Sequence, residues 1–387
     1  MHNKEYMDKL LARFAKEGPA GCACAVAQRG EVLYEGYAGY ADRESGRLID
    51  ADTVYRLFSM TKVITCAAAL ILYERGEFLL NEPLYEYIPE YRDMNVVVRR
   101  ANDGYSIEKA KNPILVKHAF SMSCGIPYSF GDSPTSRAVA DVTAKLAEKG
   151  PYDVVDHVRA LAQVPLAFEP GTQWLYGHGH EIVAALIQVI SGKTVGEFMK
   201  EEIFDRLGMT STGYRFCDDI ESRMAVAYER AEDGTLTPSD SSRSDKNHRP
   251  DSIYEGGGAG LFATVGDYLK FTQMLANGGE LKGERILGRK TIDLFRANQL
   301  NDAQLKDFRG SYTAGYGYGL GVRTMMDIVQ AHANTTPGEF GWTGALGTYT
   351  SIDPAEGASV VYMHQMRPNM EEYHHLRVRA AAYAMLK

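Results

Sequence analysis

Ser59 and Lys62 stand three residues apart in the tetrad Ser59-Met60-Thr61-Lys62, where an extended stretch meets a strongly apolar run. Residues at positions i and i+3 of a helix share a face. A serine hydroxyl is a weak nucleophile unless a base lies within hydrogen-bond reach, and a desolvated lysine can lose its proton and act as that base. The unpaired N–H groups at a helix N-terminus favour the oxyanion that forms when an acyl group is attacked. The tetrad therefore predicts acyl-transfer chemistry on Ser59.

The same pattern occurs again at Ser106-Ile107-Glu108-Lys109, so the tetrad alone has limited specificity. The first copy is followed by the apolar run 63–73, which predicts a helix buried in the centre of the protein. Ser106 lies in a polar, lysine-rich stretch without such a run. The alternative reading of Ser59 is an N-cap serine beside a snorkelling lysine, and other residues of the chain bear on that choice.

Two later segments contain the other groups that an acyl-transfer site requires. Tyr176 lies in the glycine-rich loop 170–180, where its hydroxyl can relay a proton from the serine to a leaving group. Small residues in the segment 341–347 leave the backbone open, so the N–H of Ala345 is predicted to form an oxyanion hole with the N–H of Ser59. Each segment also has a structural alternative, namely a half-buried packing tyrosine and a core strand with a bulge.

The loop around Tyr176 also holds His178 and His180, which could form a metal pair. A metal site would need a third ligand nearby, and none is evident, so neither a metal nor a cofactor is expected. His178 is instead predicted to orient the substrate or the loop.

The composition is that of an ordinary globular protein of 387 residues, with 45% hydrophobic and 24% charged residues. A net charge of −8 and the absence of a long basic block argue against a nucleic-acid partner and favour a small-molecule substrate. The first residues lack a secretory apolar region, and no apolar run reaches the length of a membrane span, so a cytoplasmic location without a membrane partner is expected. The five cysteines show no metal or redox spacing and are expected to be free thiols.

Strand signals gather at the two ends of the chain. The stretches 21–28 and 31–38 form a predicted hairpin, and further strands are expected at 318–323, 347–352 and 358–363, before a closing helix at 371–386. Helical signals dominate the middle of the chain, at 138–147, 152–162, 180–191, 195–204 and 265–277. We therefore predict an α+β fold in which both chain ends build one antiparallel sheet flanked by helices. Residues 1–58 and 255–387 would form this domain, and residues 59–254 a mostly helical lobe that carries Ser59, Lys62 and Tyr176.

The order Ser-x-x-Lys, then Tyr176, then Trp342-Thr343-Gly344 resembles the serine beta-lactamase and penicillin-recognising superfamily. It is most similar to the class C-like branch, which holds family VIII-type carboxylesterases and related peptidases. The likeness spans most of residues 5–387, including the segments 114–126, 168–209 and 256–268. The resemblance implies a beta-lactamase-like α/β sandwich. It also implies that Ser59 is the acylated nucleophile, Lys62 and Tyr176 are base and proton shuttle, and the amides of Ser59 and Ala345 form the oxyanion hole.

Departures from the family pattern concern the substrate. Penicillin-acting members usually carry Lys-Thr-Gly where this chain has Trp342-Thr343-Gly344, and Asn or Ser at the position of His178. Without that lysine, the carboxylate of a β-lactam or peptide loses its partner cation. A tryptophan suits an uncharged, apolar acyl or alcohol group. The predicted substrate contacts are therefore His178, Trp342, Thr343 and Gly344.

The sequence thus predicts a serine hydrolase that cleaves small carboxylic esters through an acyl-Ser59 intermediate. The absence of a Gly-x-Ser-x-Gly elbow argues against an α/β-hydrolase. Hydrolysis of an amide, in a β-lactam or a D-amino-acid peptide, is the alternative, because members of the superfamily share one site while differing in substrate. A third possibility is a non-catalytic binding module, against which the intact site residues count. The oligomeric state is not fixed by the sequence.

Overall fold

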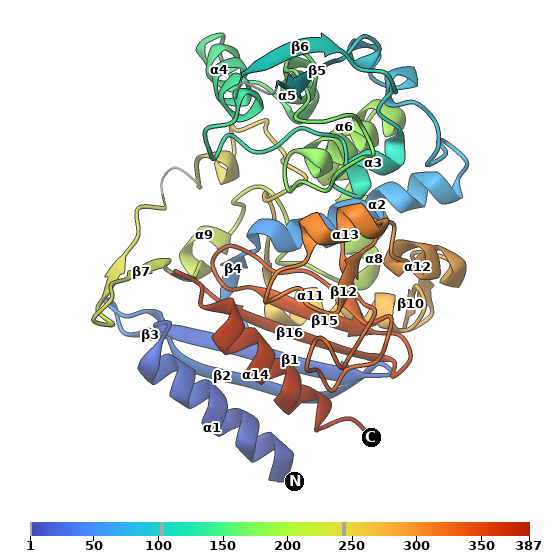
Figure 1. Cartoon of the computed structure of the whole chain (residues 1–387). Coiled ribbons are helices and arrows are strands. Elements are labelled where there is room, and N and C mark those ends of the chain that lie inside the picture. Colours follow the sequence, from blue (N-terminus) through green and yellow to red (C-terminus); the bar gives the residue numbers. More distant parts are fainter. Residues whose placement is uncertain (1, 101–103, 242–244) are drawn as a thin grey trace.

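Both ends of the chain build one eight-stranded antiparallel sheet (Figure 1). The structure is a computed structural model that describes residues 2–100, 104–241 and 245–387. The strands in spatial order are β12 (Tyr316–Tyr318), β13 (Arg323–Met325), β14 (Phe340–Gly341), β15 (Tyr349–Asp353), β16 (Ala358–His364), β1 (Gly21–Gln28), β2 (Glu31–Asp42) and β3 (Arg47–Leu48). Cys22 of β1 lies opposite His364 of β16, so residues from the two ends of the chain are direct neighbours. The predicted fold class is confirmed.

The remaining strands form small separate sheets. These are β4 (Val54–Arg56) with β9 (Phe262–Thr264), β5 (Asn95–Arg99) with β6 (Tyr105–Lys109), β10 (Glu280–Leu281) with β11 (Glu284–Arg285), and β17 (Met366–Arg367) with β7 (Tyr228–Arg230) and β8 (Leu236–Pro238).

The α-helices follow the bounds α1 (His2–Glu17), α2 (Thr61–Glu74), α3 (Val116–Phe120), α4 (Pro134–Glu148), α5 (Val154–Leu161), α6 (Gly179–Ser191), α7 (Val195–Met199), α8 (Asp205–Leu207), α9 (Ile220–Arg223), α11 (Val265–Ala276), α12 (Arg289–Arg296), α13 (Asp302–Phe308) and α14 (Glu371–Tyr383). Short 3₁₀ turns lie at Phe58–Met60, Leu84–Glu86, Pro89–Tyr91 and Lys246–His248, and a π turn at Lys200–Phe204.

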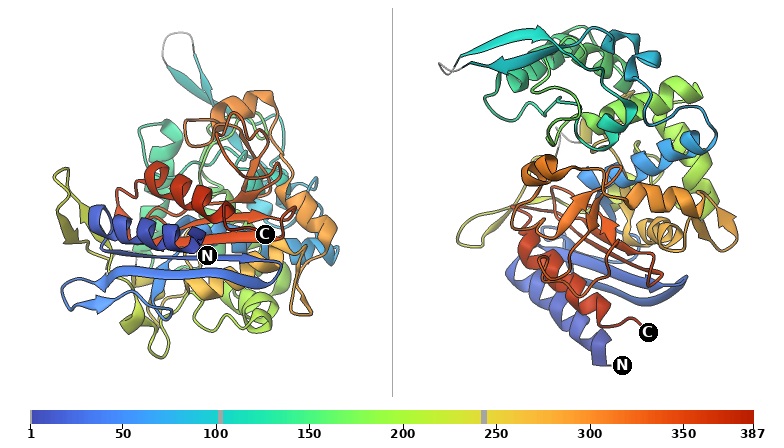
Figure 2. Two further views of the ribbon diagram at one scale, coloured as in Figure 1. Left: turned by 90° about the horizontal axis from the view of Figure 1, so that it is seen from below. Right: turned by 45° about the vertical axis from the view of Figure 1, so that its right-hand side comes forward.

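Helices cover both faces of the large sheet. The helices α1 and α14 lie together on one face, and α11 packs against β1, β15 and β16 on the other (Figures 1 and 2). Cys22 and Cys24 of β1 join the core on the α1 side, whereas Ala23 and Ala25 join the core on the α11 side, as the period of two in a strand requires. Every residue of β1 is buried, which explains why its sequence is apolar or small throughout.

The central helix α2 connects this sheet domain to the helical lobe at the top of Figure 1. It is buried from Thr61 to Leu72, so the prediction of a buried central helix is confirmed. Within the lobe, α6 packs against α2, α3, α5 and α7. The helix α2 also contacts α12, which belongs to the predicted sheet domain. The predicted domain boundaries at residues 58 and 255 stay predictions.

Among the described residues, no single helix has both the length and the apolar character to cross a membrane. The helix α6 and the segment Val195–Leu207 satisfy that test of length and composition together, with a bend of 80° between them.

Candidate active site

Ser59 lies in the 3₁₀ turn Phe58–Met60 that leads directly into α2. The helical path places Lys62 on the same side, with its Nζ 3.1 Å from Ser59 Oγ. Lys62 is fully buried. The preceding Phe58 has a φ of 46°, in the left-handed region that costs a non-glycine residue about 1 kcal/mol. The turn that presents Ser59 is therefore held in place by the surrounding structure rather than by its own preference.

Tyr176 adds a second polar group to the serine oxygen. Its hydroxyl lies 2.8 Å from Ser59 Oγ, and the Nε1–H of Trp342 donates to the Tyr176 oxygen at 3.2 Å. Lys62 Nζ also stands 4.7 Å from the centre of the Tyr176 ring. The structure thus brings together the three side chains that were predicted as nucleophile, base and proton shuttle.

Tyr128 is a further member of this group that the sequence did not reveal. Lys62 Nζ donates to the Tyr128 oxygen at 3.1 Å and to the Gly258 carbonyl at 2.7 Å. With Ser59 Oγ, these make three polar neighbours, which suit an ammonium with three donors or an amine with two donors and one acceptor. Burial, followed by the nearby Glu181, raises the pKa of Tyr128 well above its usual value, so its phenol stays protonated.

The glycine-rich segment 256–261 forms hydrogen bonds to α2 and completes the surroundings of Lys62. Thr61 Oγ1 accepts from the Leu261 N–H at 3.1 Å, and Thr65 Oγ1 donates to the Gly257 carbonyl at 2.8 Å. A Cβ on Gly257 would lie 2.1 Å from the carbonyl oxygen of His180, so this close approach of loop and helix requires glycine.

The predicted oxyanion hole depends on close contact between the segment 342–347 and Leu57. Thr348 Oγ1 donates to the Leu57 carbonyl at 2.9 Å, and the Gly344 N–H donates to the Thr348 carbonyl at 2.8 Å. A Cβ on Gly344 would lie 2.3 Å from the Leu57 oxygen. Within the described part of the chain, the Ala345 amide donates no backbone hydrogen bond, and its pairing with the Ser59 amide as an oxyanion hole stays a prediction.

Three of the predicted substrate contacts, Trp342, Thr343 and Gly344, belong to the segment 342–347. The Trp342 ring stacks on the Tyr176 ring at 5.8 Å between centroids. Thr343 Oγ1 donates to Glu371 at the start of α14, at 3.2 Å. Gly344 provides the close approach to Leu57. Their contact with substrate stays a prediction.

His178 is buried behind the groups around Ser59 that were described above. Its buried ring packs against Tyr128 and His157, with ring centroids 4.7 and 5.1 Å away. Burial, with a smaller effect of Lys62, lowers the pKa of His178 to about 3, so the ring is neutral at pH 7. Contact of His178 with substrate stays a prediction. Orientation of the loop, the other part of its prediction, fits this placement.

The second Ser-x-x-Lys copy has no such geometry. Ser106 and Lys109 belong to strand β6, where residues three apart point to opposite faces. The Ser106 hydroxyl bonds to Arg100 Nε at 3.0 Å and to Glu108 at 2.9 Å. The sequence context separated the two copies correctly.

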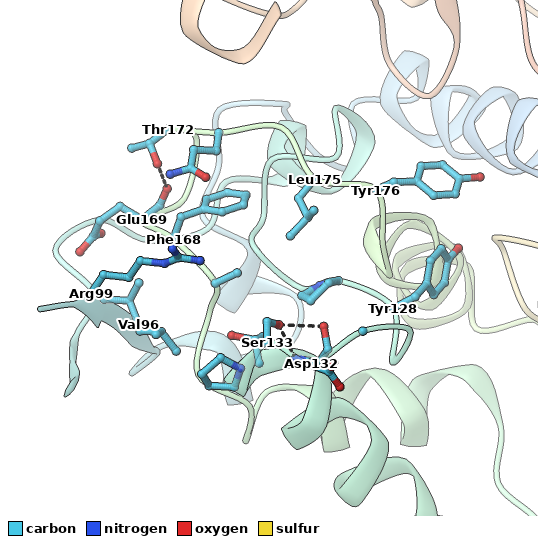
Figure 3. A pocket seen from close by; sticks show the side chains of 18 of the residues that line it. Val96, Arg99, Tyr128, Asp132, Ser133, Phe168, Glu169, Thr172, Leu175 and Tyr176 are labelled. Atoms are coloured by element: carbon cyan, nitrogen blue, oxygen red, sulfur yellow. Dashed lines mark hydrogen bonds between the residues drawn. The ribbon is translucent and has the colours of Figure 1, made fainter. Parts of the chain in front are cut away.

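A pocket of about 930 Å³ lies beside Tyr128 and Tyr176 (Figure 3). These tyrosines stand at one end of it, and Val96, Arg99 and Glu169 stand at the other. Its apolar lining includes Val98, Pro127, Phe130, Phe168 and Leu175. The volume is typical of sites for drug-sized molecules.

Potential metal ligands do not gather at this site. In the described ranges, no group of three or more His, Cys, Asp or Glu residues is placed to hold a metal ion. The cysteines are all free, with Cys22, Cys24, Cys66 and Cys124 buried and Cys217 exposed.

The fold and the groups around Ser59 define a serine hydrolase of the type that forms an acyl-enzyme. The Beta-lactamase family model matches residues 7–384, and the chain belongs to this family. Protein Rv1367c of Mycobacterium tuberculosis is 30% identical over 361 residues, which cover 91% of this chain and 87% of that protein. Esterase EstB of Burkholderia gladioli is 28% identical over 361 residues, covering 89% and 85%. The solved structure of EstCE1, a hydrolase with promiscuous acyltransferase activity, superposes with a TM-score of 0.79 at 22% identity and covers 99% of both chains.

These relatives confirm the predicted superfamily and the predicted enzyme class. Family membership does not by itself name the bond that is cleaved, because one site serves several substrates.

Proposed function

We propose that this protein hydrolyses carboxylic esters of small molecules through an acyl-enzyme on Ser59. One observation carries the proposal: Ser59 Oγ meets both Lys62 and Tyr176, while a tryptophan rather than a lysine borders Tyr176. The first part supports attack by an activated serine. The tryptophan means that this position next to Tyr176 offers no lysine to pair with a substrate carboxylate. The related protein EstB, named as an esterase, supports the same reading.

In the acylation step, Ser59 Oγ attacks the carbonyl carbon of the ester while the Lys62–Tyr176 pair accepts its proton. The carbonyl oxygen becomes an oxyanion, which the amides of Ser59 and Ala345 stabilise. Collapse of this tetrahedral intermediate breaks the bond to the alkoxy oxygen. Tyr176 returns the proton to that oxygen, and the alcohol leaves.

In the deacylation step, a water molecule attacks the acyl carbon and gives its proton to the same pair. The second tetrahedral intermediate breaks its bond to Ser59 Oγ, which regains a proton. The carboxylic acid is released, and the resting site is restored.

The pocket supports substrates with a bulky apolar acid or alcohol group. Tyr128 and Tyr176, whose hydroxyls meet Lys62 and Ser59, border one end of the pocket, and its apolar lining lies on the other side of their rings (Figure 3). Arg99 is the cationic side chain among the described lining residues, and it lies at the far end. We expect kcat/KM to rise about fourfold per added methylene along an ester series until the pocket is full, since each buried methylene contributes about 0.8 kcal/mol.

The test compares p-nitrophenyl esters of increasing acyl length with a chromogenic cephalosporin. We expect ester turnover in the wild type, its loss in Ser59→Ala, and its retention in Ser106→Ala, the matched control from the second tetrad. Lys62→Met and Tyr176→Phe should each lower acylation at least a hundredfold while circular dichroism shows an unchanged fold. Near-normal turnover in either variant would refute the proposed roles.

Other results of the same test would redirect the assignment. Turnover that favours the cephalosporin would support β-lactam hydrolysis, and release of D-alanine from D-alanyl-D-alanine would support a peptidase. If no substrate is turned over and a fluorophosphonate does not label Ser59, the chain is a non-catalytic binding module.

A further inference from the structure

Glu181, in the first turn of α6, places a buried carboxylate behind the catalytic groups. The residue is 5% exposed. Its Oε2 atom has no hydrogen-bond partner among the described residues. A buried carboxylate without a partner is costly, and such groups concentrate at sites that use their charge. The steps proposed above for ester hydrolysis do not involve Glu181.

Gly258 shows how close this carboxylate lies to Lys62. A Cβ on Gly258 would lie 2.3 Å from Glu181 Oε1 and 2.8 Å from the Tyr128 hydroxyl. Lys62 Nζ reaches the same two residues through its bonds to the Gly258 carbonyl and to the Tyr128 oxygen. Glu181 and Lys62 therefore share Tyr128 and Gly258 as neighbours, and the missing side chain at 258 leaves room for the carboxylate.

The titratable groups around Glu181 come from several elements: Lys62 of α2, Cys124 and Tyr128 after α3, His157 of α5, His178 and His180 at the start of α6, and Tyr214 and Tyr254. Burial raises the pKa of the thiol and the three phenols and lowers the pKa of the three imidazoles, so these groups are neutral at pH 7. His178 Nδ1 is 3.7 Å from Glu181 Oε2, but a neutral ring does not balance its charge. Lys62 is the group in this set whose charge is opposite to that of Glu181.

We propose that Glu181 is a positioning residue that sets where the proton resides between Lys62 and Tyr176. The inference rests on the proposed function only in that Ser59 is the nucleophile. Through the Ser59 hydroxyl, a proton can move between Lys62 and Tyr176, so the pair has two protonation states with the same total number of protons. In one state Lys62 is an ammonium and Tyr176 a phenolate; in the other Lys62 is an amine and Tyr176 a phenol. A negative charge beside Lys62 and an indole donor on the Tyr176 oxygen both favour the first state. Glu181 thereby prepares Tyr176 to accept the Ser59 proton.

The variant Glu181→Gln keeps the shape of the side chain and removes its charge. The Lys62–Tyr176 pair then loses its proton at lower pH, because the negative charge that stabilised the Lys62 ammonium is gone. On the acid side of its pH profile, the rate of Ser59 labelling falls as the pH is lowered, and we call this part of the profile the acid limb. We expect the midpoint of the acid limb to move to lower pH by about one unit, as for the loss of a unit charge several ångströms away. The readout is the rate at which a fluorophosphonate labels Ser59 between pH 5 and 10, which requires no knowledge of the natural substrate.

Glu255 provides a matched control, because it is another buried glutamate whose charge is balanced. It meets Arg215 at 3.4 Å and accepts from the Gly196 N–H at 2.6 Å. Glu255→Gln should leave the acid limb in place, and so should Glu181→Asp, which retains the charge. If Glu181→Gln fails to fold, Glu181→Met offers a second uncharged replacement for the same measurement.

Two negative results have different meanings. Slower labelling of Glu181→Gln with an unmoved acid limb would make the role of Glu181 merely structural and overturn the inference. Failure of the wild type to label at Ser59 would refute the proposed function instead.

Discussion

Two tryptophans stack on the ring of Tyr176, but only one of them donates a hydrogen bond to the Tyr176 oxygen. Trp174 and Trp342 stack against the ring with centroids 6.2 and 5.8 Å away. The Nε1–H of Trp342 donates to the Tyr176 oxygen, whereas Nε1 of Trp174 has no partner among the described residues. These are the two tryptophans of the chain, so the protein contains its own matched pair for testing the hydrogen bond.

Trp342→Phe should keep most of the stacking and remove the donor. A hydrogen bond to a charged oxygen contributes about 1.5–3 kcal/mol, so the Tyr176 phenolate becomes less stable by about that amount. We expect kcat/KM for an ester at pH 7 to fall about ten- to a hundredfold. The acid limb of the pH–rate profile should move to higher pH, opposite in sign to the shift expected for Glu181→Gln. Steady-state kinetics between pH 5 and 10 measure both effects.

Trp174→Phe is the control for this prediction. It removes an indole that stacks on the Tyr176 ring without removing a hydrogen bond. Its acid limb should stay at the wild-type position even if looser packing lowers the rate. Equal shifts in the two variants, or none in either, would show that the indole N–H does not tune Tyr176.

The site residues differ in how far the sequence could reveal them. Ser59, Lys62 and Tyr176 could be selected because their chemistry is marked by a short spacing or a glycine-rich context. Tyr128 has no such mark among 24 tyrosines and reaches Lys62 only through the fold. His178 lies two residues from Tyr176, where the chain turns into α6, and its ring packs against Tyr128, a contact that no local pattern indicates.

At the scale of elements, the site depends on the contact between Leu57 and the loop that connects β14 to β15. Leu57 immediately precedes the turn that carries Ser59, and its carbonyl oxygen is held by Thr348. Gly344 lies against the same oxygen, because it has no side chain to keep the segment away. This contact joins the sheet domain to the residue before the turn that carries Ser59, and Ala345 follows Gly344 directly in the chain.

Gly344→Ala should separate these two elements. The new methyl group would lie 2.3 Å from the Leu57 oxygen, so the segment has to move away. We expect a loss of about 1–3 kcal/mol in the free energy of unfolding, as for other overpacked sites. We also expect a fall of more than tenfold in kcat, because the Ala345 amide moves with the segment. Denaturant unfolding and ester kinetics test the two effects separately.

Gly266→Ala is the matched control for a glycine that has room. Gly266 lies within α11, and a Cβ on it would have Glu35 Oε1 as its nearest neighbour, at 4.0 Å. Alanine in a helix interior is favoured over glycine by about 0.5–1 kcal/mol, so stability should be equal or higher. Full activity of Gly344→Ala would contradict the close contact with Leu57.

The elements that the sequence did not reveal are short or depend on distant contacts. The strands β15 and β16 were predicted because β-branched and aromatic residues are frequent in them. The hairpin of β5 and β6 was missed, since its second strand is largely exposed and polar. Val97 of β5 donates to the carbonyl of Leu166, a partner far along the chain that no local pattern indicates. The helices α12 and α13 were missed because they span only eight and seven residues.

At the scale of the whole molecule, folding buries most of the histidines in neutral form. Burial is the largest cause of a lowered pKa in His118, His157, His178, His180, His248, His364, His374 and His375. They lie in both the helical lobe and the sheet domain. In the sheet domain, His364, His374 and His375 pack together beneath the segment that carries Ala345.

The lowered pKa values couple the stability of the fold to pH. An unfolded histidine takes up a proton near pH 6.5. In the folded protein the pKa is about 4 for His157 and His374 and about 3 for His180 and His375. Between these values the unfolded state binds more protons, so the free energy of unfolding falls as the pH falls. Above pH 7 these histidines are neutral in both the folded and the unfolded protein, so they do not change the free energy of unfolding with pH.

We therefore expect the protein to unfold cooperatively in mild acid, near pH 5. Each coupled histidine lowers the free energy of unfolding by about 1.4 kcal/mol per pH unit, and several together exhaust the usual 5–15 kcal/mol within one or two units. Calorimetry between pH 8 and 4.5 should show a Tm that is constant above pH 7 and falls steeply below pH 6.5. His248→Gln should reduce this slope, whereas replacement of the exposed His332 by Gln should not. A Tm that stays constant down to pH 5 would mean that the buried histidines become protonated without unfolding.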